Sequence, residues 1–131
     1  MQDKTIRSLL YVSILSAALL FFTGFSAVHT HKLCETWMRE ADLCLDAVEE
    51  GQLSDAYRQL TELEKKWLAH QLFIAATQTH DDIDTINTAF RTAYLHLSHN
   101  CTDEFYTEIA ALRDTFEKMH DIQQISFENI L

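Results

Sequence analysis

The stretch that decides the architecture is SLLYVSILSAALLFFTGFSAV, residues 8–28, which contains no charged side chain. Arg7 precedes it, and His29, His31 and Lys32 follow it. At about 1.5 Å of rise per residue, these residues form a helix roughly 31 Å long, which matches the hydrocarbon core of a bilayer. The sequence therefore predicts one transmembrane helix over residues 8–28.

The short segment before this helix indicates its orientation. Residues 1–7 contain Lys4 and Arg7 beside the α-amino group, against the single acid Asp3. Positive charge close to a transmembrane helix favours the cytoplasmic side. The sequence therefore predicts a protein of the cell membrane that crosses it once, with a cytoplasmic tail over residues 1–7 and an extracytoplasmic domain over residues 29–131.

A cleaved signal peptide is the alternative interpretation of the same segment. Gly24, Phe25 and Ser26 place small residues where a signal peptidase would cut. However, the uncharged run is longer than the roughly 7–15 residues of a signal core, and no polar break precedes the cleavage motif. We therefore expect the helix to be retained. Both interpretations deliver residues 29–131 to the same side of the membrane.

The rest of the chain has the composition of one helical domain. About 100 residues follow the apolar segment, which is enough for a modest core. The 131-residue chain has no proline and only two glycines, Gly24 and Gly51, so the turn residues that β folds need are scarce. The predicted fold class is all-α, with one N-terminal transmembrane helix followed by an extracytoplasmic antiparallel bundle of about four helices.

The charge of the chain is strongly negative and unevenly distributed. The formal net charge is −10, and from His29 onward there are eight Lys and Arg against nineteen Asp and Glu. Such a surface repels phosphate groups, so we expect no nucleic-acid partner and no binding to anionic headgroups through a basic patch. The surface favours cationic partners, or it serves solubility alone.

The three cysteines, Cys34, Cys44 and Cys101, cannot all pair within one chain. Cys34 and Cys44 would lie about 15 Å apart on one helix, which is too far for a disulfide. A disulfide, if one forms, joins Cys101 to one of the other two. We expect three ordinary, partly buried thiols, because no Cys-x-x-Cys motif occurs.

Apolar side chains recur every three or four residues along two stretches that flank Gly51. A glycine there can adopt the left-handed conformation that ends a helix, and Ser54 can cap the next helix. The short connection predicts an antiparallel pair, with Trp37 facing Trp67. The first stripe, on a helix from about His31 to Glu50, is Leu33, Trp37, Ala41, Cys44 and Val48; the second is Tyr57, Leu60, Leu63, Trp67 and Ile74.

Two further stretches have the same helical spacing. We expect a turn near residues 79–82, although the sequence from Trp67 to Leu97 contains no Gly or Pro and also permits one long rod. Residues 99–101 form the next predicted break, and Thr102 is the predicted cap of the last helix. The third stripe is Ile83, Ile86, Phe90, Tyr94 and Leu97; the fourth is Phe105, Ile109, Leu112, Phe116, Met119 and Ile122; and the apolar end, expected to dock on the bundle, is Ile125, Phe127, Ile130 and Leu131.

The aromatic residues fall on these stripes, so we expect them to pack a core rather than to form a ligand cage. A few positions should matter most for structure or interaction, because they lie at the centre of a stripe, at the glycine turn or at the apolar end. These positions are Trp37, Gly51, Trp67, Ile83, Phe90, Phe116, Phe127 and Ile130.

The seven histidines raise the question of a metal site. His80 with Asp84, and His96 with His99, are spaced so that each pair can face one way on a helix. The Glu-x-x-His motif that ends at His120 has the spacing used in di-iron bundles, but no second copy occurs. We expect no metal site and no cofactor. We also identify no catalytic residue, because no motif for a nucleophile and its base is present.

Four segments of the body occur together behind the N-terminal anchor. They are GQLSDAY at residues 51–57, LTELEKKW at 60–67, HDDID at 80–84 and SFENIL at 126–131. In this combination the sequence resembles domain-of-unknown-function family 4363, short anchored proteins seen mainly in spore-forming Gram-positive bacteria. The resemblance covers nearly the whole chain. It implies an extracytoplasmic helical module on a membrane anchor, and it implies no activity.

The leading functional hypothesis is a non-enzymatic interaction or scaffold protein. Such a protein would contact the bilayer through residues 8–28 and a protein partner in the membrane or envelope through an acidic groove between helices. The alternative is an extracytoplasmic sensor of pH or divalent cations that uses His70, His80, His96 and His99, because imidazole titrates near neutral pH.

Overall fold

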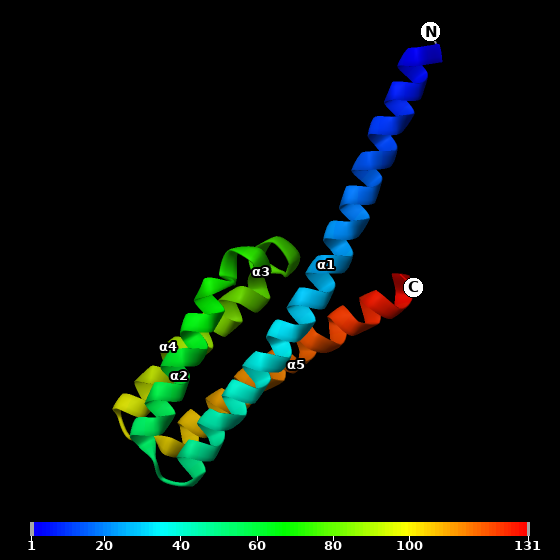
Figure 1. Cartoon of the computed structure of the whole chain (residues 1–131). Helices are drawn as coiled ribbons and strands as arrows, with labels where there is room; N and C mark the ends of the chain where they lie inside the picture. The colour runs from blue at the N-terminus through cyan, green and yellow to red at the C-terminus, as the bar shows by residue number, and fades with distance from the viewer. Residues whose placement is uncertain (1, 131) are drawn as a thin grey trace.

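The computed structural model describes the backbone of residues 2–130 and the side chains of residues 2–76 and 78–122. Helices and short connections make up this whole range, without a strand (Figure 1). The predicted all-α fold class is therefore confirmed. The helices are α1 (Gln2–Glu49), α2 (Leu53–Ala69), α3 (Gln71–Thr77), α4 (His80–Ser98) and α5 (Thr102–Ile130).

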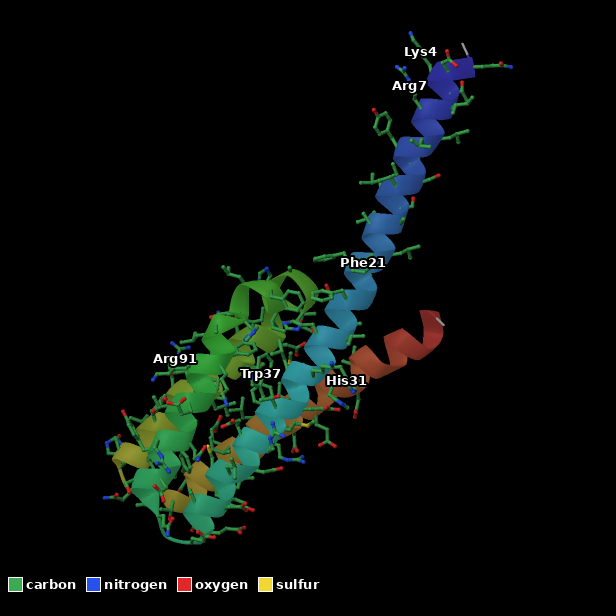
Figure 2. The ribbon with its side chains drawn as sticks, in the orientation of Figure 1. Lys4, Arg7, Phe21, His31, Trp37 and Arg91 are labelled. Atoms are coloured by element: carbon green, nitrogen blue, oxygen red, sulfur yellow. The ribbon has the colours of Figure 1, made fainter. Side chains whose placement is uncertain are left out.

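Helix α1 is a single helix of 48 residues that joins the apolar segment to the body. Its N-terminal half projects away from the other helices, and the side chains of Arg7 and Phe21 there are exposed (Figure 2). By length and composition this helix is suited to cross a membrane, and a signal sequence has the same properties. Burial begins at Ser26, inside the last turn of the predicted span over residues 8–28. The predicted span and the first body helix are thus continuous.

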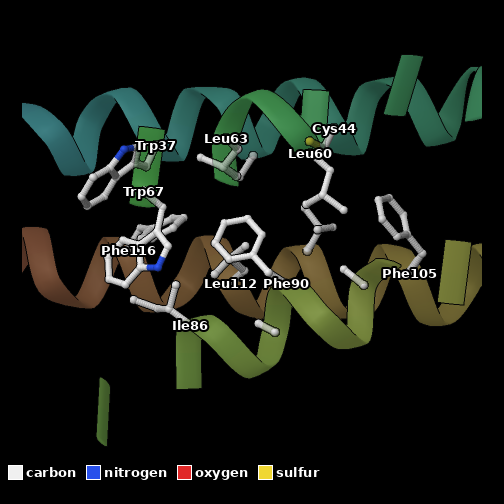
Figure 3. Close-up of a cluster of buried hydrophobic side chains, with 14 of the residues drawn as sticks. Trp37, Cys44, Leu60, Leu63, Trp67, Ile86, Phe90, Phe105, Leu112 and Phe116 are labelled. Atoms are coloured by element: carbon white, nitrogen blue, oxygen red, sulfur yellow. The ribbon is translucent and has the colours of Figure 1, made fainter. Parts of the chain in front are cut away.

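The C-terminal half of α1 packs mainly on α5 and α2, and α4 packs on α5 (Figure 1). The predicted antiparallel pairing of α1 with α2 is confirmed, because the rings of Trp37 and Trp67 meet edge to face with centroids 5.4 Å apart. Figure 3 shows both tryptophans in one layer with Phe116. The largest fully buried side chains are Trp37, Trp67, Phe90, Phe105, Phe116, Leu60, Leu63, Ile74, Ile86, Ile109, Leu112 and Met119.

The turn between α1 and α2 depends on Gly51. Its φ of 73° lies in the left-handed region, as predicted. The Gly51 amide donates to the Val48 carbonyl at 3.0 Å and the Gln52 amide to the Ala47 carbonyl at 2.8 Å, the two bonds of a Schellman motif. The predicted Ser54 cap is wrong. Because α2 begins at Leu53, Ser54 already lies in its first turn, and Gln52 occupies the cap position without a side-chain hydrogen bond.

Replacement of Gly51 by alanine is expected to destabilise the body by about 1–2 kcal/mol, because an L-residue is strained at this φ. A Cβ there would meet no atom within 4 Å, so the cost is conformational and not steric. Gly24→Ala is the matched control, since a Cβ at this helical glycine also meets nothing within 4 Å. Urea unfolding of the detergent-solubilised chain, followed by circular dichroism, measures the free energy of unfolding of both variants. Equal stability of Gly51→Ala and wild type would contradict the expectation.

The break between α4 and α5 repeats the same geometry without a glycine. Asn100 has a φ of 56°, and the Cys101 amide donates to the His96 carbonyl at 2.8 Å. The break predicted at residues 99–101 is confirmed. The predicted Thr102 cap is shifted by one residue, because Thr102 is the first residue of α5 and the Cys101 carbonyl accepts from the Phe105 amide.

Helices α2 and α4 are separate, so the expected turn is confirmed and the single rod is not formed. The hydroxyl of Thr79 accepts from the Asp82 amide at 3.3 Å and caps α4. The predicted second helix, which extended to Ile74, is wrong in one respect: it breaks at His70. There the His70 ring Nδ1 lies 3.0 Å from the Lys66 carbonyl, while the backbone amide bonds to Trp67.

Two predicted stripe residues are not in the core. Tyr57 is 56% exposed and packs its ring edge on Tyr94, with centroids 5.7 Å apart, at the rim between α2 and α4. Ile122, in the C-terminal half of α5, is 43% exposed. The backbone of α5 continues as helix to Ile130. The predicted docking side chains of Ile125, Phe127 and Ile130, together with Leu131, lie outside the described residues.

Candidate functional site

A groove runs between the exposed faces of α4 and α5. Its volume is about 480 Å³, and three carboxylates line it without a lysine or arginine. We call it the acidic groove. Its lining residues are Asp81, Asp84, Thr85, Thr88 and Ala89 from α4, and Glu108, Ala111, Leu112 and Thr115 from α5.

The local sequence explains why these side chains face the groove. Asp81, Asp84 and Thr88 follow one another at steps of three and four residues, so they form a single row along α4. Glu108 and Thr115 are seven residues apart on α5 and form the facing row. The buried neighbours Phe90 and Leu112 fix the two helices against each other from below. The groove is therefore held by the core and does not require a loop.

Two cations of the body form ion pairs with carboxylates of α1. Lys66 of α2 pairs with Glu40 of α1, and Arg113 of α5 donates from Nε to Asp42 of α1 at 2.6 Å. The hydrogen bond with Asp42 raises the pKa of the Arg113 guanidinium above its ordinary value. Both pairs join α1 to a neighbouring helix. One cation does lie beside the groove, because the Arg91 guanidinium donates to Oγ1 of the lining residue Thr88 at 3.4 Å.

The histidines that sequence spacing singled out do not converge. His80 begins α4 and His96 lies in its last turn, so roughly 24 Å separate them along the helix. His99 is exposed, and its Nδ1 lies 3.0 Å from the Leu95 carbonyl. Within the described part of the chain, His80, Asp84, His96 and His99 belong to no group of three or more residues with ligand atoms within 4.8 Å of one another.

A different group does meet this distance: His31, Glu35 and His120. The Nε2 atoms of His31 and His120 lie 3.2 Å and 3.3 Å from the same oxygen, Oε1 of Glu35. The two imidazole rings stack with centroids 3.8 Å apart. We call this group the histidine–glutamate cluster. Figure 2 shows His31 where α1 and α5 lie together, next to the projecting part of α1.

Sequence reasoning missed this cluster for an identifiable reason. His31 and Glu35 have the i, i+4 spacing that places two ligands on one helical face, and His120 was noticed only as part of a Glu-x-x-His motif. The third ligand comes from a helix 85 residues further along the chain. Only the register of α1 against α5 shows that these residues meet.

A cluster of ring contacts lies at the end of the bundle nearest the projecting part of α1. The His29 ring contacts Phe25 with centroids 5.8 Å apart, Phe73 at 5.1 Å and His70 at 5.8 Å. Helix α3 therefore lies at the level of residue 29, where the predicted span ends. Leu72 in α3 is 90% exposed. The body thus presents an exposed apolar side chain on α3, near the C-terminal end of the apolar segment of α1.

The three cysteines are free thiols, as expected from the sequence. Cys34 and Cys44 are fully buried. Burial, assisted by Glu35 and Glu40 respectively, raises the pKa of each of these two thiols to about 12. Because the thiolate is the reactive form, both are poor nucleophiles at neutral pH.

Thiol labelling should separate the cysteines. With iodoacetamide at about pH 8, Cys101 is expected to react in the folded chain, because it is partly exposed, whereas Cys34 and Cys44 stay protonated and covered. Mass spectrometry of the labelled protein in detergent should show one label per chain before denaturation and three after it. Two or three labels on the folded chain would contradict the buried positions.

Six of the residues singled out from the sequence have clear structural positions. Gly51 forms the turn between α1 and α2. The other five lie in the core, where their side chains pack against one another and their neighbours. The core residues are Trp37, Trp67, Ile83, Phe90 and Phe116. The remaining two, Phe127 and Ile130, lie outside the described side chains.

A family model matches residues 25–130, and its description reads "Domain of unknown function (DUF4363)". The matched range begins one residue before the first buried side chain of α1 and covers the whole bundle. The exposed apolar part of α1 lies almost entirely outside it. No curated protein and no solved structure matches the chain.

Proposed function

The chain belongs to the DUF4363 family, as its resemblance predicted, and from this premise we propose that it is a non-enzymatic interaction module anchored in a membrane by residues 8–28. The N-terminal tail lies in the cytoplasm and the helical body outside. The body binds a cationic segment of a protein partner in the acidic groove. The family description assigns no activity, so the proposal depends on the site.

The acidic groove is the observation that carries this proposal. Its volume is about 480 Å³, and its three carboxylates would meet Lys or Arg side chains of the partner. Complementary charge of this kind speeds association and selects among partners more than it adds affinity. The excess of acids over bases from residue 29 onward extends the same negative field around the groove.

The continuity of α1 supports a scaffold role. One helix carries both the apolar segment and the side of the core that packs on α5, so the groove has a fixed position relative to the anchor. Exposed Leu72 on α3 would touch the lipid surface and limit tilting of the body. A partner in the same membrane would then meet the groove in one orientation.

The state of the thiols supports a non-enzymatic role. A cysteine nucleophile needs a lowered pKa and an adjacent base. Cys34 and Cys44 have the opposite property, because burial raises the pKa of both thiols to about 12. These two side chains serve the core.

Site-specific photo-crosslinking in cells tests the proposed interaction. A benzophenone amino acid at Thr88, in the acidic groove, is expected to capture a membrane or envelope protein with a basic segment. The same probe at Arg58, which is exposed on α2 and does not line the groove, should not capture it. Crosslinking should weaken as salt rises, because the attraction is screened.

Charge reversal provides the matched comparison. Asp84→Lys with Glu108→Lys should abolish the crosslink at Thr88, whereas Glu50→Lys with Glu62→Lys makes the same change in net charge away from the groove and should preserve it. The proposal fails if no protein is captured at Thr88. It also fails if both double variants lose the crosslink equally, because net charge alone would then explain binding.

A further inference from the structure

We propose that His31, Glu35 and His120 form a binding site for one divalent transition-metal cation of the zinc class, which fastens α5 to α1 at the membrane-proximal end of the bundle. This goes beyond partner binding, because the site lies on other residues and another face than the acidic groove. The two functions can therefore fail separately.

The spacing of the three ligand atoms fits such an ion. Zinc binds histidine nitrogen and carboxylate oxygen at about 2.0–2.2 Å, so two ligand atoms in a tetrahedral site lie roughly 3.3 Å apart. Glu35 Oε1 lies 3.2 Å from His31 Nε2 and 3.3 Å from His120 Nε2. All three atoms lie within 4.8 Å of one another. An ion can therefore enter among them with small rotations of the side chains.

The type of donor selects the kind of ion. Two imidazoles and one carboxylate suit zinc and its neighbours cobalt, nickel and copper, whereas calcium and magnesium prefer sites made of oxygen alone. Three protein ligands leave the fourth tetrahedral position open to water or to a group from a partner. Cys34, next to Glu35 in sequence, does not compete, because its side chain is fully buried in the core.

The surroundings of His120 support a ligand role. Its side chain is only 16% exposed, against 32% for His31 and 57% for Glu35, so the ring is held in place while an entry path remains open over Glu35. Its second nitrogen, Nδ1, faces Asp121 Oδ1 at 3.4 Å. A carboxylate in that position orients a metal-binding imidazole and fixes which nitrogen carries the proton.

The position of the site gives the ion a structural effect. His31 is three residues beyond the predicted span, and His120 precedes the last ten residues of α5. The ion would connect residues 85 positions apart in the chain and fix the end of α5 beside the base of the anchor. Binding to the folded chain alone would also raise the melting temperature, since it adds to the free energy of unfolding.

Zinc titration of the full-length chain tests the site. The protein is purified in detergent without a polyhistidine tag and titrated calorimetrically with zinc chloride at neutral pH. Wild type is expected to bind one zinc per chain and to melt at a higher temperature with zinc than with a chelator. Cobalt should give the visible absorption of a tetrahedral ion. Glu35→Gln, a conservative change at an exposed position, and His120→Ala should each weaken binding at least about tenfold.

Matched variants exclude binding at other donors. His99→Ala and Cys101→Ser remove accessible donors outside the cluster and should leave zinc affinity and the thermal shift unchanged. Circular dichroism of the metal-free variants verifies that each one folds. The proposal is overturned if wild type takes up no zinc, which is the result expected if the two imidazoles do no more than hydrogen-bond to Glu35. It is equally overturned if Glu35→Gln and His120→Ala bind zinc as wild type does.

Discussion

Replacement of Trp67 by alanine is expected to destabilise the body by about 3–5 kcal/mol, the range for removal of a buried aromatic side chain. The Trp67 ring is fully buried, and its centroid lies 5.4 Å from that of Trp37 and 6.3 Å from that of Phe116. Its Nε1 donates to Oδ1 of Asn87 at 2.8 Å. The ring therefore joins α2 to α1, α5 and α4 at once.

Urea unfolding of the detergent-solubilised chain, followed by far-UV circular dichroism, measures the effect. Asn87→Ala removes the partner of the indole nitrogen and keeps the ring, so it should cost less, about 1–3 kcal/mol. Leu72→Ala is the surface control and should change stability by about 0.5 kcal/mol or less, because that side chain is 90% exposed. A Trp67→Ala chain as stable as wild type would show that this layer does not hold the bundle together.

Two arginines in the middle of the apolar segment are expected to detach the protein from the membrane. Leu15 and Leu19 are exposed on α1, and their replacement by arginine costs about 2.5–3.5 kcal/mol each at the centre of a transmembrane helix, roughly 5–7 kcal/mol together. Alkaline carbonate extraction of membranes should release Leu15→Arg with Leu19→Arg into the supernatant. Wild type should stay in the pellet.

The control for this experiment keeps the same positions apolar. Leu15→Phe with Leu19→Phe alters size and shape but not the cost of transfer into lipid, so this variant should remain in the pellet. If the double arginine variant also resists extraction, residues 8–28 are not what holds the protein to the membrane.

The sequence was most informative where periodicity and turn chemistry agree. The stripes through Trp37, Trp67, Phe90 and Phe116 identified the buried faces because a helix that packs on one side repeats its apolar residues every three or four positions. Gly51 identified the first turn, because its left-handed φ suits glycine. Local rules of this kind need no knowledge of the other helices.

Errors arose where two local signals competed. Ser54 is a good cap residue, but α2 already begins at Leu53 after the glycine turn. The Ser54 hydroxyl therefore lies inside the first turn of the helix and not at the cap position. His70 lies within an unbroken apolar pattern, yet its ring approaches the Lys66 carbonyl and ends α2. Tyr57 shares the spacing of the stripe, but it lies at the rim, where its hydroxyl stays close to water. Backbone propensity alone does not decide such cases.

The two sites differed in how far sequence could predict them. An acidic groove between helices was expected from the charge excess, but its position between α4 and α5 follows from packing. The histidine–glutamate cluster was not expected, because His120 meets His31 only through the register of α5 against α1. Spacing along the sequence singled out His80 with Asp84 and His96 with His99 instead, and within the described residues neither pair belongs to a group of three ligand atoms.

The central claim is that residues 8–28 stay in the membrane with the helical body folded outside. Intact-mass spectrometry of the chain, recovered separately from membranes and from the culture medium, tests this most directly. The account predicts that the protein is found in the membrane fraction at the full mass of 15.2 kDa. A shorter chain, free in the medium and beginning after Ser26, would contradict it.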